Sequence, residues 1–273
     1  MELVASARLR RAQERIEAMR PYADRMLELM AGTARASGSV QSFPLLQRRD
    51  VQTVAIVPVT GDRGLAGAFN AQILRRSMAL YRELQGQGAD VRWLPVGRKG
   101  ASTLRFSRFE VFSDWGGFSD NPRYGDAQAI AHRLAELYTS GEVDRVVIVY
   151  NHFVSALVQH VTVQDVLPIH EDVMDTSDEE REHDRQTGDF IFEPEPEQIL
   201  ERLLPVYLET EIYRALLESA ASEQGARMTA MRNASKSAGE LIDSLTLEMN
   251  RARQAEITQE ILEVVAGADA LTT

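Results

Sequence analysis

The sequence predicts an α/β protein in which helices from the two ends of the chain pair as an antiparallel two-helix coiled coil, with an α/β domain inserted between them. Two observations predict the coiled coil: apolar residues repeat in steps of four and three at the start of the chain, and the same repeat returns near its end. A third observation, the alternation of strand-like and helix-like segments between residues 51 and 167, predicts the inserted domain.

The start of the chain, up to about residue 33, predicts a helix with an apolar seam along one side. Pro21 lacks a backbone donor, so we expect a bend near residues 18–21. The stretch 32–44 is rich in Gly, Ser, Thr and Ala, which marks the end of the helix. The seam consists of Ala5, Leu9, Ala12, Ile16, Met19, Ala23, Met26 and Met30.

The chain from 206 to 266 predicts one long helix with a matching seam. A seam this narrow is typical of a helix that winds around another helix and does not lie on a globular core. If the helix already starts at Glu197, Pro205 should kink it. Beyond Ala252 the apolar set broadens over 257–265, and we expect this end to be held in another protein. The seam consists of Leu217, Ala221, Gln224, Met228, Met231, Ser235, Ala238, Ile242, Leu245, Met249 and Ala252.

Between the two helical ends, β-branched runs alternate with segments of helical periodicity. Three strands separated by helices imply right-handed crossovers and helices that cover the sheet, so the middle of the chain is expected to be a Rossmann-like α/β domain. A fourth strand follows the third through a hairpin. The expected strands are 51–59, 91–96, 143–151 and 158–167, and the expected helices are 69–84 and 126–138.

These patterns divide the chain into four parts. The third part is strongly acidic: residues 171–197 hold twelve acidic side chains against Arg181 and Arg185, which predicts a solvated connection. The parts are an N-terminal coiled-coil helix (1–43), the Rossmann-like domain (44–170), an acidic linker with a short strand (171–196) and the C-terminal coiled-coil helix (197–273).

Composition excludes several classes of function. The 273 residues include no cysteine, so disulfides and thiolate metal sites are excluded. The formal net charge of -11 argues against nucleic acid as a partner. No apolar run approaches the length needed to cross a bilayer, so no direct membrane insertion is expected.

A glycine-rich turn from Gly61 to Gly67 follows the first expected strand, where a dinucleotide enzyme would hold phosphate. Its G-x-x-G-x-x-G spacing matches neither the dinucleotide fingerprint nor the phosphate loop, and a tight turn is the simpler interpretation. The histidines show no metal-ligand spacing, and no nucleophile motif is present. We therefore predict no catalytic, cofactor-binding or metal-binding residue.

Several segments resemble the gamma subunit family of F-type ATP synthases, the central rotor stalk. The most specific is 257–270, which fits the family's C-terminal signature I-T-x-E-x-x-E-x-x-x-G-A-x-A. The segments 226–234, 250–255, 61–65 and 7–13 also resemble family sequence, and the resemblance covers essentially the whole chain.

The resemblance implies a shaft and not a catalyst. In this family the coiled coil sits inside a hexamer of alpha and beta subunits, and the central domain contacts the epsilon subunit and the c-subunit ring, with one copy per complex. It also implies a peripheral membrane protein on the cytoplasmic face of a bacterial cell membrane, in which proton-driven rotation of the c ring changes the shape of the catalytic beta subunits.

The family's contact residues are carried over motif by motif. Phe190 and Glu193 fall in the short strand of the family's foot region. The beta-subunit contacts implied by the resemblance are Arg227, Arg253, Gln254, Thr258 and Glu260, and the family's neck loop corresponds to Gly61, Asp62, Arg63, Gly64 and Leu65.

Family members normally continue for several helical turns before the position of Met1. The resemblance therefore implies either a misassigned start codon or a shortened first helix, and in the second case 255–266 would lack their partner within the chain. Two other functions stay open on the residues alone. One is a nucleotide-dependent enzyme using the 61–67 turn, and the other is a coiled-coil scaffold with a non-catalytic Rossmann-like domain.

Overall fold

The computed structural model describes residues 1–36, 43–170 and 195–272. The chain divides into two compact units, Met1–Thr229 and Ala230–Thr273. The first unit holds the sheet, the N-terminal helix and the first part of the C-terminal helix, and the second unit continues that helix.

A four-stranded sheet with the order β2-β1-β3-β4 forms the centre of the first unit. Strands β2, β1 and β3 run parallel, whereas β4 pairs with β3 in the antiparallel direction. The β-branched runs of the sequence form these strands, since such side chains pack well on a pleated surface. The strands are β1 (Thr53–Pro58), β2 (Asp90–Trp93), β3 (Arg145–Phe153) and β4 (Gln159–Leu167).

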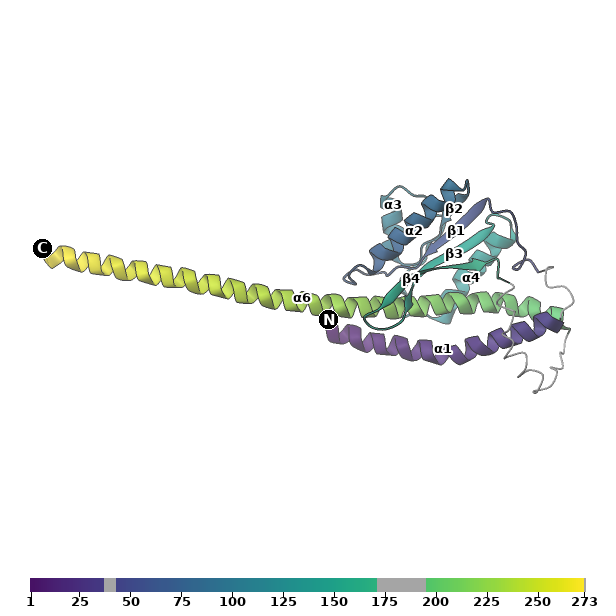
Figure 1. The fold of residues 1–273 in the computed structure, drawn as a ribbon, viewed down its shortest axis with the longest axis horizontal. Helices are drawn as coiled ribbons and strands as arrows, with labels where there is room; N and C mark the ends of the chain where they lie inside the picture. Colours follow the sequence, from purple (N-terminus) through teal and green to yellow (C-terminus); the bar gives the residue numbers. More distant parts are fainter. Residues whose placement is uncertain (37–42, 171–194, 273) are drawn as a thin grey trace. The chain divides into compact units, whose positions relative to one another are not determined.

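Helices cover both faces of the sheet (Figure 1). Because neighbouring side chains on a strand point to opposite faces, Val54 and Ile56 join one apolar cluster, while Ala55 and Val57 join another. The first cluster is closed by α2 (Phe69–Gly86), and the second by α4 (Tyr124–Thr139) together with the C-terminal helix. The expected order of strands and helices is therefore present, with two helices between β2 and β3 where one was expected.

The sequence prediction missed the helix α3 (Arg98–Phe106). We expected residues 97–100 to be only the exit from the second strand. Only Gly100, Ala101 and Leu104 are buried within this nine-residue helix, so its apolar periodicity is too short to be recognised.

The two terminal helices lie side by side in opposite directions within the first unit (Figure 1). Helix α1 spans Glu2–Ala36, and α6 spans Pro196–Thr272. Met30, near the end of α1, shares the larger apolar cluster with Leu200, near the start of α6. Ala12 of α1 lines a pocket together with Leu217, much later in α6, so the helices are antiparallel.

The apolar seam of α1 faces the protein as predicted. Ala5, Leu9, Met26 and Met30 are buried, and the remaining seam positions are half-buried. Both helices run through their internal prolines, Pro21 in α1 and Pro205 in α6. Figure 1 shows that the axis of α1 bends part-way along its length, as the proline predicts.

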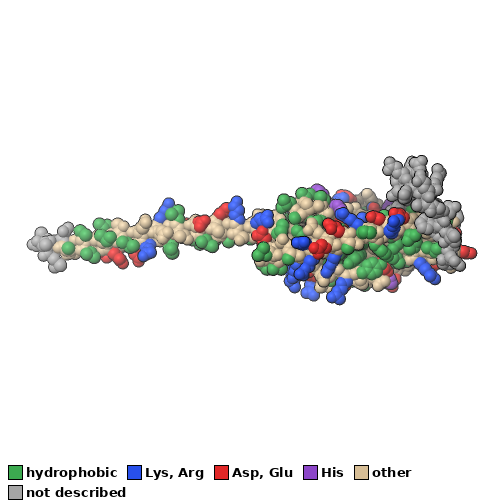
Figure 2. Space-filling model, turned by 90° about the horizontal axis from the view of Figure 1, so that it is seen from below, with side chains coloured by type: hydrophobic (Ala, Val, Ile, Leu, Met, Phe, Trp, Pro, Cys, Tyr) green, Lys and Arg blue, Asp and Glu red, His purple; other side chains and the backbone are tan. Residues whose placement is uncertain are grey.

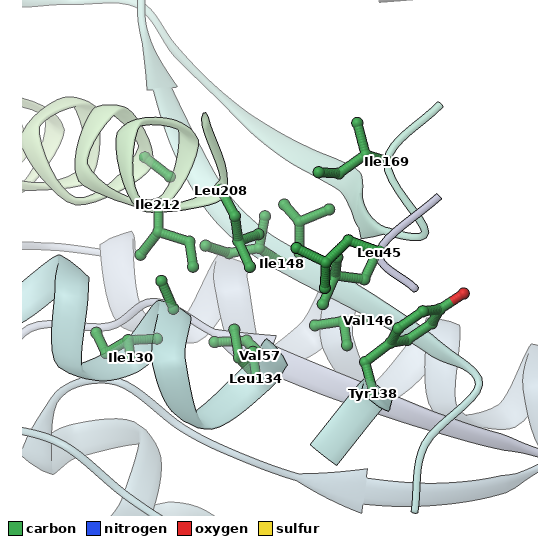
Figure 3. Close-up of a cluster of buried hydrophobic side chains, with 14 of the residues drawn as sticks. Leu45, Val57, Ile130, Leu134, Tyr138, Val146, Ile148, Ile169, Leu208 and Ile212 are labelled. Atoms are coloured by element: carbon green, nitrogen blue, oxygen red, sulfur yellow. The ribbon is translucent and has the colours of Figure 1, made fainter. Parts of the chain in front are cut away.

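The prediction of a narrow seam is wrong for the first part of α6. Every residue from 215 to 225 is buried, which no single seam could produce. The physical reason is that this segment packs on the sheet and α4 as well as beside α1. Figure 3 shows Leu208 and Ile212 of α6 among Ile130 and Leu134 of α4 and the strand residue Ile148. This part of α6 is a core helix of the α/β domain.

The second unit has the opposite character. It is helical, and almost all of its described side chains from Arg232 to Ala268 are exposed, including large apolar ones. Ile242 is 63% exposed and Met249 61%, and both belong to the predicted seam. Figure 2 shows hydrophobic side chains at intervals along this helix. None of the helices in the described ranges is both long and apolar enough to cross a membrane.

These two environments predict different responses to the same substitution. Leu208→Ala should lower the free energy of unfolding of the full chain by about 3 kcal/mol, because it leaves a cavity in the core. Leu241→Ala is the matched control on the same helix, and since Leu241 is 59% exposed its cost should stay within about 0.5 kcal/mol. Chemical denaturation of both variants measures the difference, and equal costs would contradict the burial described above.

Candidate functional site

Asp62, in the turn after β1, holds three segments of the first unit together. Its carboxylate accepts hydrogen bonds from the backbone N–H groups of Arg98 at 3.0 Å, Gly117 at 2.8 Å and Ser119 at 3.0 Å. Its own N–H donates to the Ser119 hydroxyl at 2.9 Å. Burial raises the pKa of Asp62, but the donors outweigh burial and the net pKa lies below its usual value. The turn is therefore tied to the start of α3 and to the loop that leads to α4.

Glu223 of α6 packs directly against this turn. Its side chain is almost completely buried, and a Cβ atom on Gly61 would lie only 2.7 Å from its carboxylate carbon. A side chain at 61 would therefore have to displace the buried Glu223 carboxylate. Burial raises the pKa of Glu223, and the neighbouring Arg227 guanidinium opposes that rise.

Arg227, one helical turn after Glu223 on α6, contacts the same turn. It donates to the Glu223 carboxylate at 2.5 Å and to the Gly64 carbonyl at 3.4 Å, and it lies 3.6 Å from a carboxylate oxygen of Asp120. Only 8% of Arg227 is exposed. Buried charges persist in proteins when they are paired in this way. We call the group formed by Gly61, Asp62, Gly64, Asp120, Glu223 and Arg227 the neck junction.

The chemistry of the junction disfavours the nucleotide-binding alternative. A phosphate-binding turn presents free backbone N–H groups to the anion. Here the N–H of Gly61 already donates to the Asn70 side chain at 2.8 Å, and that of Asp62 to Ser119. The carboxylates of Asp62 and Glu223 would also repel a phosphate. The turn is a structural joint that packs against α6.

Two further buried carboxylates join α6 to the α/β domain through histidines. Glu209 accepts a hydrogen bond from the Tyr124 hydroxyl at 2.7 Å and lies 3.0 Å from the ring nitrogen Nε2 of His132. Glu218 lies 2.5 Å from Nδ1 of His152 on β3. Burial and the Glu209 carboxylate both raise the pKa of Tyr124, which keeps its hydroxyl proton in place as the donor. Both histidines thus have structural partners.

Across the described part of the chain, no group of three or more His, Cys, Asp or Glu side chains is arranged to hold a metal ion. Instead, each of three buried carboxylates on α6, those of Glu209, Glu218 and Glu223, is paired with another side chain of the protein. The arrangement is that of a helix fixed to a domain.

The family model described as ATP synthase matches residues 1–271. An ATP synthase gamma chain from Synechococcus sp. is 43% identical over 291 aligned residues, covering 99% of this chain and 92% of the relative. One from Rubrobacter xylanophilus is 45% identical over 272 residues, covering 99% and 91%.

The chain belongs to the ATP synthase gamma-chain family. A solved structure agrees: this chain is similar to a chain in the central stalk and c-ring structure of the Tetrahymena thermophila mitochondrial ATP synthase. The TM-score is 0.61 at 28% identity, with 86% of this chain and 97% of that chain covered. Membership in the gamma-chain family makes this protein the central shaft of an ATP synthase.

The structure brings together two sets of residues that the gamma-family resemblance had named separately. The neck loop, 61–65, and Arg227 meet at the neck junction. The Arg227 guanidinium is buried by its partners in the junction. Its contact with a beta subunit stays a prediction. Arg63 and Leu65 do remain exposed at the rim of the loop.

The other predicted contacts lie on the helix of the second unit. Positions 253 and 260 are two turns apart and 254 and 258 one turn apart, so Arg253 and Glu260 share one face of the helix, and Gln254 and Thr258 share a neighbouring face about 100° further round. All four are exposed, and the Thr258 hydroxyl donates to the Gln254 carbonyl at 2.8 Å. Their subunit contacts are likewise untested predictions.

The foot-region residues Phe190 and Glu193 lie outside the described residues, as does most of the predicted acidic linker. Sequence reasoning missed Asp120 and Glu223 as members of a site. The sequence held two signals of this site. Glu223 and Arg227 stand four residues apart, which is the spacing of an ion pair on a helix, and Gln224 is a polar residue at a position of the apolar seam.

Asp62→Asn tests the joint at the turn. At neutral pH the substitution should lower the free energy of unfolding of the full chain by about 2–3 kcal/mol, because an amide cannot accept three N–H bonds as a carboxylate does. The folded-state pKa of Asp62 lies below the usual 3.8, so its charge stabilises the fold above that value. This stabilisation is lost as the pH falls through the lowered folded-state pKa.

Denaturation of wild type and Asp62→Asn across a pH series should therefore show a difference that narrows under acid conditions. Asp114→Asn is the control, since the exposed pair of Asp114 with Arg105 at 2.7 Å is worth less than about 1 kcal/mol. A difference between wild type and Asp62→Asn that stays constant with pH would contradict the role given to the Asp62 charge.

Proposed function

We propose that this chain is a non-catalytic rotor shaft that couples proton-driven rotation of a membrane c ring to conformational change in catalytic beta subunits. The observation that carries the proposal is the contrast along α6, which is buried in the α/β domain up to Arg227 and exposed with apolar side chains from Arg232 onward. A rotor shaft needs one part that is fixed to the body that rotates, and another part that contacts the subunits whose conformation it changes.

The partners follow from this division. The exposed helix of 230–272 would lie within a hexamer of alpha and beta subunits, where its apolar side chains would be covered. The Rossmann-like α/β domain would contact the epsilon subunit and the c-subunit ring. The relatives' names and the central stalk and c-ring structure support association with an ATP synthase. The proposed complex holds one copy of the chain, which uses no cofactor of its own.

The terminal helices would act as an antiparallel coiled coil, supported by the buried seam of α1 and its opposite direction to α6. The complex would place the chain at the cytoplasmic face of a bacterial cell membrane, held there by its partners. Family membership favours this shaft over a coiled-coil scaffold that works without a hexamer.

Reconstitution tests the proposal directly. Purified alpha and beta subunits are mixed with or without this chain, and ATP hydrolysis is followed at substrate concentrations that fill one or several sites. We expect the chain to form a complex with the hexamer and to produce cooperative multi-site hydrolysis, while showing no hydrolysis alone. Self-association of the chain without capture by the hexamer would support the scaffold instead.

The exposed polar side of the second unit gives a sharper prediction. Arg253→Glu with Gln254→Ala should lower proton-driven ATP synthesis in membranes about fivefold or more, since a lost contact to a charged group costs about 1.5–3 kcal/mol. The fold should be unaffected, because both side chains are exposed.

Glu248→Arg is the matched control, because it also reverses an exposed charge and position 248 lies about 120–140° around the helix from positions 253 and 254. Its effect on synthesis should be clearly smaller. Unchanged synthesis in the double variant, or an equal loss in the control, would contradict a specific contact at Arg253 and Gln254.

A further inference from the structure

Asp120, in the loop before α4, receives contacts from three separate parts of the first unit. One carboxylate oxygen accepts a hydrogen bond from Arg8 of α1 at 2.7 Å and lies 3.8 Å from Arg63 of the neck loop. The other accepts from the Gln224 amide of α6 at 3.0 Å and lies 3.6 Å from Arg227. One carboxylate thus faces three guanidinium groups.

We propose that Asp120 is a positioning residue of the shaft: its charge locks α1, α6 and the neck loop to the α/β domain so that they turn as one body. The inference rests on the proposed shaft function and assigns part of the torque transmission to a single ionic contact. No subunit other than this chain is needed to form that contact.

The position of the contact explains why a charge is used there. The α1 members of the larger apolar cluster begin at Met26, whereas toward the N-terminus only Ala5 and Leu9 of the seam are buried and the positions between Ala12 and Ala23 are half-buried. The N-terminal half of α1 therefore buries fewer apolar side chains. Arg8 lies in this half, and its ion pair with Asp120 ties it to the loop before α4.

The loop that carries Asp120 is itself held in place. The residue before it, Ser119, donates its N–H to Asp62 at 3.0 Å, and Asn121 after it accepts a hydrogen bond from Arg15 of α1. A charge that is already positioned loses less conformational entropy on pairing. The Asp120 side chain is 25% exposed and that of Arg227 10%, so salt screens this pair less than a surface pair, whereas the side chains of Arg8 at 41% and Arg63 at 72% are closer to solvent.

Asp120→Asn tests the proposal in the reconstituted complex embedded in membrane vesicles, because it removes the charge and keeps the size. The measured quantity is the ratio of ATP-driven proton pumping to ATP hydrolysis. We expect this ratio to fall about threefold or more, since charged hydrogen bonds are about twice as strong as neutral ones. Asp120→Glu keeps the charge and should retain more coupling than Asp120→Asn.

Arg11→Gln is the matched control. Arg11 lines the same pocket as Arg8, one helical turn further along α1, and forms no ion pair with any described residue. Its coupling ratio should equal that of wild type. A double-mutant cycle adds the decisive comparison: if Arg8 acts through Asp120, then Arg8→Gln combined with Asp120→Asn should couple no worse than Asp120→Asn alone.

A coupling ratio in Asp120→Asn equal to that of wild type would overturn the proposal, as would losses that add in the double variant. A complex that assembles in normal amount but couples poorly supports it, because a purely structural role would lower assembly and hydrolysis together. Failure of the wild-type complex to couple pumping to hydrolysis would count against the proposed shaft function itself.

Discussion

Three carboxylates on one helix, Glu209, Glu218 and Glu223, are buried at the surface where α6 meets the rest of the first unit. A buried carboxylate is costly unless it is paired, and each of these has a partner: His132 and Tyr124, His152, and Arg227. Apolar packing alone would allow α6 to slide or rotate along its neighbours. The paired charges fix its register against α4, β3 and the neck loop, and the rest of the structure depends on that register.

This constraint separates the two tasks of a single helix. Between Leu200 and Arg227, α6 is part of a domain core and shares its apolar cluster with α1 and the sheet. From Arg232 to Ala268 almost all of its side chains are exposed, and they include large apolar residues such as Ile242 and Met249. In the proposed function, the first segment fixes α6 to the α/β domain, and the second segment contacts the alpha and beta subunits. Coupling between subunits requires contacts that differ between states, and an exposed helix fixed at its base can supply them.

The sequence predicted the strands and the longer helices, but it missed α3 and the contacts that join the elements. The step of four and three residues correctly placed Ala5, Leu9 and Met30 on the buried side of α1, because that period is a local property. The same pattern misled for α6, where residues 215–225 are buried on all sides through packing on a sheet that no local period reveals. The contacts of Asp120 with Arg8 and Gln224 join positions more than 100 residues apart, so only the folded chain brings them together.

Hydrogen exchange of the full chain, followed by mass spectrometry, tests most directly whether α6 is one helix with two environments. Amides between residues 200 and 227 should exchange slowly, because opening them requires disruption of the domain core. Amides between 232 and 266 should exchange orders of magnitude faster in the isolated chain and become protected when the alpha and beta subunits are added. Equal protection along the whole of α6 in the isolated chain, or fast exchange at 200–227, would contradict the account.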